Sequence, residues 1–277
     1  MNRLAEWMQH RDSILVMGIL NVTPDSFHDG GRFPGVGDAV ESALRMEADG
    51  ADLIDLGGES SRPGAAPVGV QEELDRVLPV LEGLRARSDI PISIDTTKAE
   101  VARRAIAAGA CMVNDITALQ GDEEMAGVIA ASSAFAVLMH MRGTPQTMQA
   151  DPVYEDVVGE VSDFLSERRE AAIQAGIRAD RIWMDPGIGF GKHLEHNLEL
   201  LRHIDRLAHL GSPVLIGLSR KSFIGRILDL STDERLEGTI AANAIAVARG
   251  ADVIRVHDVR EGRRTADIAL RLRRPDA

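Results

Sequence analysis

Three polar side chains of related chemistry directly follow short apolar runs in this sequence: Asp95, Asn114 and Asp185. Each carboxylate accepts two parallel N–H bonds and the carboxamide both donates and accepts, so together they suit a flat heterocycle with amidine-like N–H groups. A single aspartate in such a position would be explained equally well by capping of the next helix. Three that converge on one point favour a binding pocket.

Basic residues form a second group. Arg255 and His257 stand two positions apart at the end of the last apolar run, so they share one face of an extended strand. Lys221 follows the seventh run, and Arg62 lies in a loop after the second. Strands seven and eight of a closed α/β barrel commonly form a phosphate site. Arg255 and His257 therefore predict an anion cradle, to which Arg62 adds a further cation.

Two other features bear on the ligand. Asn21 ends the first apolar run, where an amide oxygen can coordinate a Mg²⁺ ion that also holds a diphosphate, although asparagine is equally common in turns. The segment 185–192 is rich in glycine, but Pro186 and His193 break the P-loop pattern. We expect its glycines to let the backbone approach a flat ligand, with Phe190 as a stacking face.

Eight apolar runs alternate with helical patterns and must position these residues. Parallel strands buried on both faces read as continuous hydrophobic runs, and eight alternations with helices favour closure into a barrel. The expected strands are 13–20, 53–54, 92–94, 112–113, 136–139, 182–184, 214–218 and 253–254. The expected helices are 38–49, 72–84, 98–108, 123–131, 153–175, 193–207, 236–249 and 265–272. We therefore predict an α/β protein, a single (β/α)8 TIM barrel with long loops after the first and second strands.

Bulk properties narrow the classes of partner. The 277 residues suit one barrel domain over 1–277, and the single cysteine, Cys111, excludes an internal disulfide. A net charge of −12 opposes nucleic acid and anionic membranes, so an anionic substrate must meet a local basic cluster. Residues 1–12 lack the apolar core of a secretory signal, and no segment approaches the roughly 18 apolar residues of a membrane helix. We expect a cytoplasmic protein with no nucleic-acid or membrane partner.

Taken together, the motifs resemble those of the dihydropteroate synthase family. The matching segments occur in the family's order and cover nearly the whole chain. They are 17–27 (MGILNVTPDSF), 55–64 (DLGGESSRPG), 93–96 (SIDT), 114–116 (NDI), 139–141 (MHM), 185–191 (DPGIGFG), 219–222 (SRKS) and 255–257 (RVH). Any one of these motifs is moderate evidence, whereas the ordered set is highly specific.

The resemblance implies a transferase of folate biosynthesis. It would condense 7,8-dihydropterin-6-ylmethyl diphosphate with 4-aminobenzoate, giving 7,8-dihydropteroate and diphosphate, with Mg²⁺ as cofactor and as a homodimer. The implied pterin site comprises Asp95, Asn114, Ile116, Met139, Asp185, Phe190 and Lys221. The implied diphosphate site comprises Asn21, Arg62, Arg255 and His257, with Asn21 as metal ligand, and the aminobenzoate site Phe27, Ser61, Arg62, Pro63, Lys221 and Ser222. Asp95, Lys221 and Arg255 are the residues implied in catalysis.

One position departs from the family pattern, and two other functions stay open. The family commonly has threonine where this chain has Ser61, which keeps the hydroxyl and loses a methyl group. We expect activity to persist, while sensitivity to sulfonamide competitors is left open. A methyltetrahydrofolate-dependent corrinoid methyltransferase would keep the acidic and amide pocket but has less use for the basic cluster. A catalytically inactive pterin-binding homologue would release no diphosphate when both substrates are present.

Overall fold

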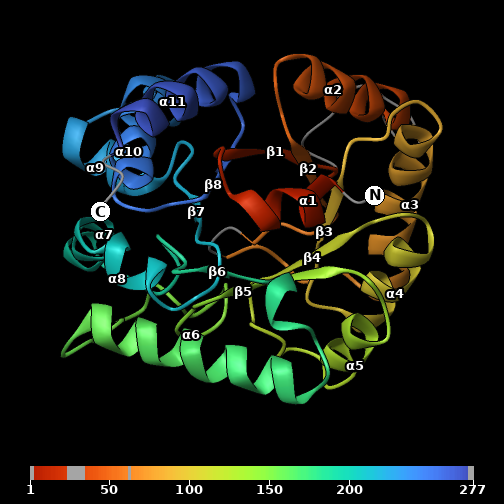
Figure 1. Ribbon diagram of the computed structural model, residues 1–277, viewed down its shortest axis with the longest axis horizontal. Helices are drawn as coiled ribbons and strands as arrows, with labels where there is room; N and C mark the ends of the chain where they lie inside the picture. Colours follow the sequence, from red (N-terminus) through yellow and green to blue (C-terminus); the bar gives the residue numbers. More distant parts are fainter. Residues whose placement is uncertain (1–2, 24–34, 62–63, 274–277) are drawn as a thin grey trace.

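A computed structural model describes residues 3–23, 35–61 and 64–273 as a parallel β-barrel surrounded by helices (Figure 1). All neighbouring strands pair in parallel, in the order β6-β5-β4-β3-β2-β1-β8-β7. The strands are β1 (Leu15–Asn21), β2 (Leu53–Gly57), β3 (Ile92–Asp95), β4 (Met112–Asp115), β5 (Phe135–Met139), β6 (Ile182–Asp185), β7 (Leu215–Gly217) and β8 (Val253–Val256). The two ends of this sheet meet where Met184 bridges Val214 and the Met184 amide donates to the Pro213 carbonyl at 2.9 Å. The predicted (β/α)8 barrel is confirmed.

Helices follow the strands and form the outer ring (Figure 1). They are α2 (Val36–Ala48), α3 (Val70–Arg85), α4 (Ala99–Ala107), α5 (Met125–Ala130), α6 (Val157–Gln174), α7 (Leu194–Arg202), α8 (Ile204–Ala208), α9 (Ser222–Leu228), α10 (Leu236–Ala248) and α11 (Val259–Leu272). Helix α1 (Arg3–His10) precedes β1 and is not part of this ring. The helix expected at 193–207 is divided at His203, and the last helix begins six residues earlier than expected. The sequence patterns missed α1 and α9. Within the described residues, none of these helices combines the length and the apolar content needed to cross a bilayer.

Alternation along each strand separates an outer core from an inner one. Side chains such as Val16, Ile54 and Val113 point outwards and pack against the helices. Their neighbours Met17, Leu53 and Met112 point inwards and fill the lower part of the barrel. Because successive strand residues face opposite sides, the inward position two residues further on lies above this apolar layer. Asp55, Asn114 and Asp185 occupy such positions on β2, β4 and β6.

Helix α1 closes the opposite end of the barrel. Leu4 and Trp7 are buried with the inner apolar layer, and α1 crosses the centre of the ring in Figure 1. The Trp7 ring meets the edge of Trp183 from β6, with 5.5 Å between ring centroids, and the Trp7 indole donates to the Ser13 carbonyl at 2.9 Å. Within the described residues, the barrel is therefore open only at the carboxyl ends of the strands, where loops surround it.

Removal of this plug should cost stability and spare the site. Trp7→Ala deletes a buried aromatic ring, so we expect the free energy of unfolding in urea to fall by about 3–5 kcal/mol. His10→Ala, an exposed change on the same helix, is the control and should leave the unfolding midpoint unchanged. Equal unfolding midpoints for Trp7→Ala and the unmodified chain would contradict the role of α1.

Candidate active site

The Arg255 guanidinium is the centre of a polar cluster at the carboxyl ends of the strands. Arg255 lies on β8, and its Nε donates to Asp55 Oδ2 at 2.6 Å, while Nη2 donates to Asp95 Oδ2 at 2.8 Å. Asn114 Nδ2 donates to the same Asp55 oxygen at 3.0 Å. Four strands, β2, β3, β4 and β8, are thereby joined through their inward side chains.

Burial makes this cluster electrostatically demanding. Asp55 is fully buried, and within the described part of the chain its Oδ1 atom has no hydrogen-bond partner. Burial and the nearby Asp55 charge raise the pKa of Asp95 from 3.8 to about 7. Burial opposes the charge on Arg255, but the Asp55 and Asp95 carboxylates outweigh it and raise the pKa of Arg255. Arg255 therefore stays charged while Asp95 is set to change its charge near neutral pH.

A second charge pair comes from β6 and the turn after β7. The Gly187 amide donates to Asp185 Oδ1 at 2.7 Å, and burial raises the pKa of Asp185, opposed first by Lys221. Lys221 donates to the Ile188 carbonyl, and its Nζ lies 4.8 Å from the centre of the Phe190 ring. Burial lowers the pKa of Lys221 to about 8. The Asp185 charge also acts on Arg255, so the two charge groups share one electrostatic environment.

Two glycines keep space open between these groups. Gly57 on β2 and Gly217 on β7 end their strands at the barrel rim. A Cβ atom on Gly57 would lie 3.6 Å from Asn21 Oδ1 and 3.7 Å from Asp95 Oδ2, and one on Gly217 would lie 4.0 Å from Lys221 Nζ. The missing side chains leave room into which oxygen and nitrogen atoms point from several strands.

The space above Gly57 has the donor chemistry that Mg²⁺ prefers. Asn21 Oδ1 lies beside it, and Mg²⁺ selects oxygen ligands, whereas the nearby Asp95 Oδ2 already accepts a hydrogen bond from Arg255. In the described ranges, no group of three or more His, Cys, Asp or Glu side chains is arranged to hold a metal ion. An ion here would thus have few protein ligands and depend on water and on substrate oxygens, which is the usual state of Mg²⁺ at phosphate sites.

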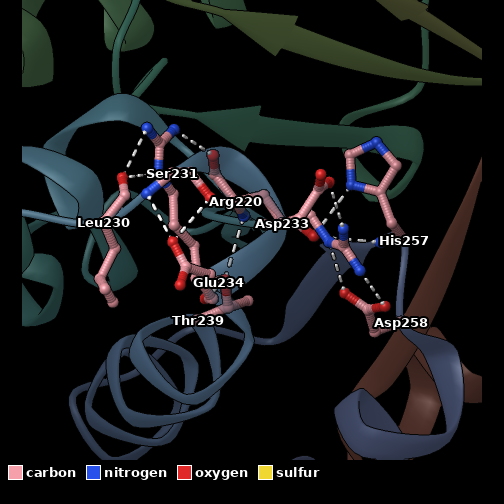
Figure 2. A network of polar contacts seen from close by, with 10 residues as sticks. Arg220, Leu230, Ser231, Asp233, Glu234, Thr239, His257 and Asp258 are labelled. Atoms are coloured by element: carbon pink, nitrogen blue, oxygen red, sulfur yellow. Dashed lines mark hydrogen bonds and ion pairs between the residues drawn. The ribbon is translucent and has the colours of Figure 1, made fainter.

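The turn between β7 and α9 is held by a dense polar network (Figure 2). Arg220 has a left-handed backbone with φ of 56°, and its guanidinium donates to both Asp258 oxygens at 3.0 and 2.8 Å. Its amide donates to Thr239 Oγ1 at 3.0 Å. The Ser219 hydroxyl lies 2.9 Å from His257 Nδ1. The network ties the Lys221 turn to the segment that follows Arg255.

Loops after β2, β3, β4 and β5 enclose a cavity of about 150 Å³ beside this cluster. Ser60 and Ser61 line it from the loop after β2, and Asp95 and Ile116 line it from the barrel side. The cavity therefore connects Asp95 at the end of β3 with the loop after β2, which contains Ser61.

Comparison with known proteins identifies the family. Residues 17–257 match the pterin binding enzyme family. The chain is 51% identical over 245 residues to the dihydropteroate synthase of Synechocystis, covering 88% of this chain and 85% of that protein. The chain belongs to the dihydropteroate synthase family. Among solved structures of the family, the enzyme of Xanthomonas albilineans with 4-aminobenzoic acid superimposes with a TM-score of 0.89 at 48% identity, covering 95% of this chain and 94% of that one. The Yersinia pestis dihydropteroate synthase with a sulfonamide drug gives 0.89 at 45% identity and 95% of both chains.

The structure brings together most residues that the dihydropteroate synthase motifs singled out. Asp95, Asn114, Asp185, Lys221 and Arg255 form the two charge groups described above. Asn21 and Met139 end β1 and β5 at the same rim, and Phe190 faces Lys221. Ser222 begins α9 and is exposed, as is His257. Phe27, Arg62 and Pro63 lie outside the described residues.

Two polar residues of the site lie in the sequence segments 55–64 and 185–192 but were not among the predicted site residues. Asp55 lies inside β2 rather than at its end, between the outward-facing Ile54 and Leu56. The sequence signal that could have identified Asp55 as a site residue is its position as a charged side chain among the apolar residues of β2. Lys192 is buried, and its Nζ lies 2.8 Å from His140 Nδ1 and donates to the Phe190 and Gly187 carbonyls at 3.0 and 3.1 Å.

Contacts of the glycine-rich segment explain its composition. A Cβ atom on Gly187 would lie 1.9 Å from the His140 carbonyl oxygen, so the segment packs directly on backbone after β5. Gly187 also has φ of 65°, which glycine adopts readily. Lys192 fastens the same segment from beneath. In this family member, the wall that carries Phe190 is thus fixed by backbone packing and one buried lysine.

Proposed function

We propose that this chain condenses 7,8-dihydropterin-6-ylmethyl diphosphate with 4-aminobenzoate to form 7,8-dihydropteroate and diphosphate. The observation that carries this proposal is the pairing of Arg255 with Asp55 and Asp95, beside Asp185 and Lys221, in a member of the dihydropteroate synthase family. It places acceptors for a pterin next to cations for a leaving diphosphate. We further propose that residues 1–277 act as one pterin-binding domain.

The pterin would occupy the deepest part of the site. Asp95, Asn114 and Asp185 present carboxylate and amide groups that match the N–H and carbonyl edges of the ring. Lys221 adds a donor at the rim, and its ammonium group already lies against an aromatic face. Ile116, Met139 and Phe190 supply the apolar walls. The buried Asp55 does not face the ligand in this arrangement but holds Arg255 and Asn114 in place.

The diphosphate would lie at the other side of the rim. Asn21 and Arg255 come from β1 and β8, which are neighbours in the sheet, and His257 directly follows β8. Arg62 would add charge from the loop after β2. The space above Gly57 would hold Mg²⁺ through Asn21 and the diphosphate oxygens. When bound, this ion would neutralise charge that develops on the leaving group.

The aminobenzoate would bind between the loops after β1, β2 and β7. Phe27, Ser61, Arg62, Pro63, Lys221 and Ser222 are the residues that we assign to it. Support comes from two relatives, one solved with 4-aminobenzoic acid and the other with a sulfonamide drug. Ser61 retains the hydroxyl that the family places here. Sulfonamides, as aminobenzoate mimics, would compete at this position.

The chemistry follows from the placement of charges. The C–O bond to diphosphate breaks, its electron pair leaves with the diphosphate, and positive charge develops on the pterin methylene. Ionised Asp95 beside the ring stabilises that charge, and the fixed groups need no reorganisation during the reaction. The neutral arylamine nitrogen then forms the new C–N bond and loses a proton. Since this amine is already nucleophilic, the residues mainly position it.

The alternative functions account for fewer of these observations. A corrinoid-dependent methyltransferase would use the pterin pocket but has no leaving diphosphate for the basic groups. An inactive homologue has no use for Arg255 held between two carboxylates.

Mass spectrometry of the reaction tests the activity. Purified protein with both substrates and Mg²⁺ should form dihydropteroate and release diphosphate only when both substrates are present. A sulfonamide should reduce the rate, and a chelator should reduce it reversibly. Diphosphate release without aminobenzoate, or no product under any condition, would reject the proposal.

Asp95→Asn tests the role of the carboxylate. The change keeps the shape and removes the charge that stabilises the developing cation, so kcat should fall by about 100-fold. Affinity for the pterin diphosphate, measured by calorimetry, should change much less. Equal losses in rate and affinity would show that Asp95 contributes binding alone.

The same carboxylate should shape the pH profile. The kcat/KM value reports ionisations of the free enzyme, and the reactive form of Asp95 is the ionised one. Because the pKa of Asp95 is raised to about 7, kcat/KM should rise with pH through a limb centred near 7. This limb should be absent from the residual activity of Asp95→Asn. A profile that is flat between pH 6 and 8 in the unmodified chain would contradict the assignment.

We also propose that the chain forms a homodimer through α9, α10 and α11. Exposed apolar residues gather on these three helices, which lie together in Figure 1, and large exposed apolar patches mark protein interfaces. They are Ile227, Leu228, Ile245, Ile268 and Leu272. Sedimentation should give twice the chain mass of 29.9 kDa, whereas a monomer at micromolar concentration would rule the dimer out.

A further inference from the structure

An ion triad, of which only Glu73 is fully buried, lies at the base of the loop between β2 and α3. Lys98, at the start of α4, donates to Glu59 Oε2 and, at 2.6 Å, to Glu73 Oε2. Glu73 belongs to α3 and is fully buried, and in the described part of the chain its Oε1 atom lacks a hydrogen-bond partner. Burial opposes the charge of Lys98, but the two carboxylates outweigh it and raise the pKa of Lys98. Lys98 therefore keeps its positive charge at neutral pH.

Glu59 uses both carboxylate oxygens to organise the loop. Its Oε1 accepts a hydrogen bond from the Val68 amide at 2.9 Å, near the far end of the loop, while Oε2 binds Lys98. Glu59 thus draws the two ends of the loop together and fastens both to α4. A charge-assisted link of this kind is stronger than a neutral one.

Two contacts nearer the middle of this loop are weaker. The Gly64 amide donates to the Pro145 carbonyl at 3.3 Å, and Gln146 Nε2 donates to the Ala65 carbonyl at 3.3 Å. Both are long, and the second is solvent-exposed. The base of the loop is consequently the better fixed part.

The triad lies beside the residues that face the substrates. Ser60 and Ser61 directly follow Glu59, and Lys98 follows Asp95 by three positions. Residues from both segments line the same cavity. Lys98 therefore sets the spacing between Ser60 and Ser61 on one side of the cavity and the end of β3 on the other.

We propose that Glu59 and Lys98 are positioning residues that fix the aminobenzoate side of the site relative to Asp95. This inference rests on the proposed function for its kinetic consequence but not for its structural one. Neither residue takes part in bond making or breaking. Loss of their link would displace Ser60 and Ser61, so aminobenzoate binding would weaken while the pterin pocket stayed intact.

Glu59→Gln is the sharpest test, because it keeps the Lys98–Glu73 pair. Val68 and Lys98 donate to different oxygens of Glu59, and in a glutamine one of these positions is an NH2 group that cannot accept either bond. We expect KM for 4-aminobenzoate to rise by about tenfold, which corresponds to loss of one charge-assisted bond. Affinity for the pterin diphosphate and the thermal midpoint should stay close to those of the unmodified chain.

Two comparisons separate positioning from general damage. Glu100→Gln removes an exposed carboxylate that pairs with Arg103 on α4, and it should change neither constant. Lys98→Met with Glu73→Met replaces the buried pair by apolar groups, which avoids stranding Glu73 as an unpaired charge. This double variant should show the same selective rise in KM, and adding Glu59→Gln to it should have little further effect.

Amide hydrogen exchange without substrates gives a readout that does not depend on activity. Exchange at residues 64–69 should be faster in Glu59→Gln than in Glu100→Gln. Unchanged exchange, or equal changes in both substrate constants, would overturn the positioning role. Absence of dihydropteroate from the unmodified chain would reject the proposed function alone, because the exchange result would still decide this inference.

Discussion

The position of one guanidinium determines how the polar end of this barrel is organised. Arg255 reaches from β8 to carboxylates on β2 and β3, and the amide of Asn114 completes the group from β4. Removing either partner of a buried ion pair leaves an uncompensated charge, which costs several kcal/mol. The acidic residues therefore require Arg255, and Arg255 requires them. A substrate that binds here enters a site whose charges are already paired and oriented.

Much of this arrangement could be predicted because strands impose a period of two. Once eight parallel strands are recognised, inward positions follow, and Asp95, Asn114, Asp185 and Arg255 must face one another above the apolar layer. The barrel itself follows from the repeated apolar runs. Short helices such as α9 escaped because seven residues carry little periodic signal, and α1 precedes the first strand, so the strand–helix alternation did not call for it.

The remaining polar residues depend on contacts between distant segments. Asp55 reads as the end of an apolar run until pairing shows that β2 continues to Gly57. Lys98 and Glu59 are 39 residues apart, and each looks like an ordinary solvated residue of a loop or helix start. Only the packing of α3 against the barrel buries Glu73 and gives Lys98 its partners. No local sequence pattern predicts that Glu59, Glu73 and Lys98 come into contact.

The plug formed by α1 determines from which end of the barrel ligands can reach the proposed site. Within the described residues, Trp7 and Trp183 close the lower end of the barrel. Reactants and products of the proposed reaction would therefore enter and leave at the carboxyl ends of the strands. In the proposed arrangement the pterin lies deeper than the aminobenzoate. A bound aminobenzoate would therefore block the path of the pterin diphosphate, which would have to bind first. Dihydropteroate, with its pterin at the deep end and its aminobenzoate ring nearer the loops, would leave past the same loops. The proposed placement of the two ligands would thus favour an ordered addition of substrates.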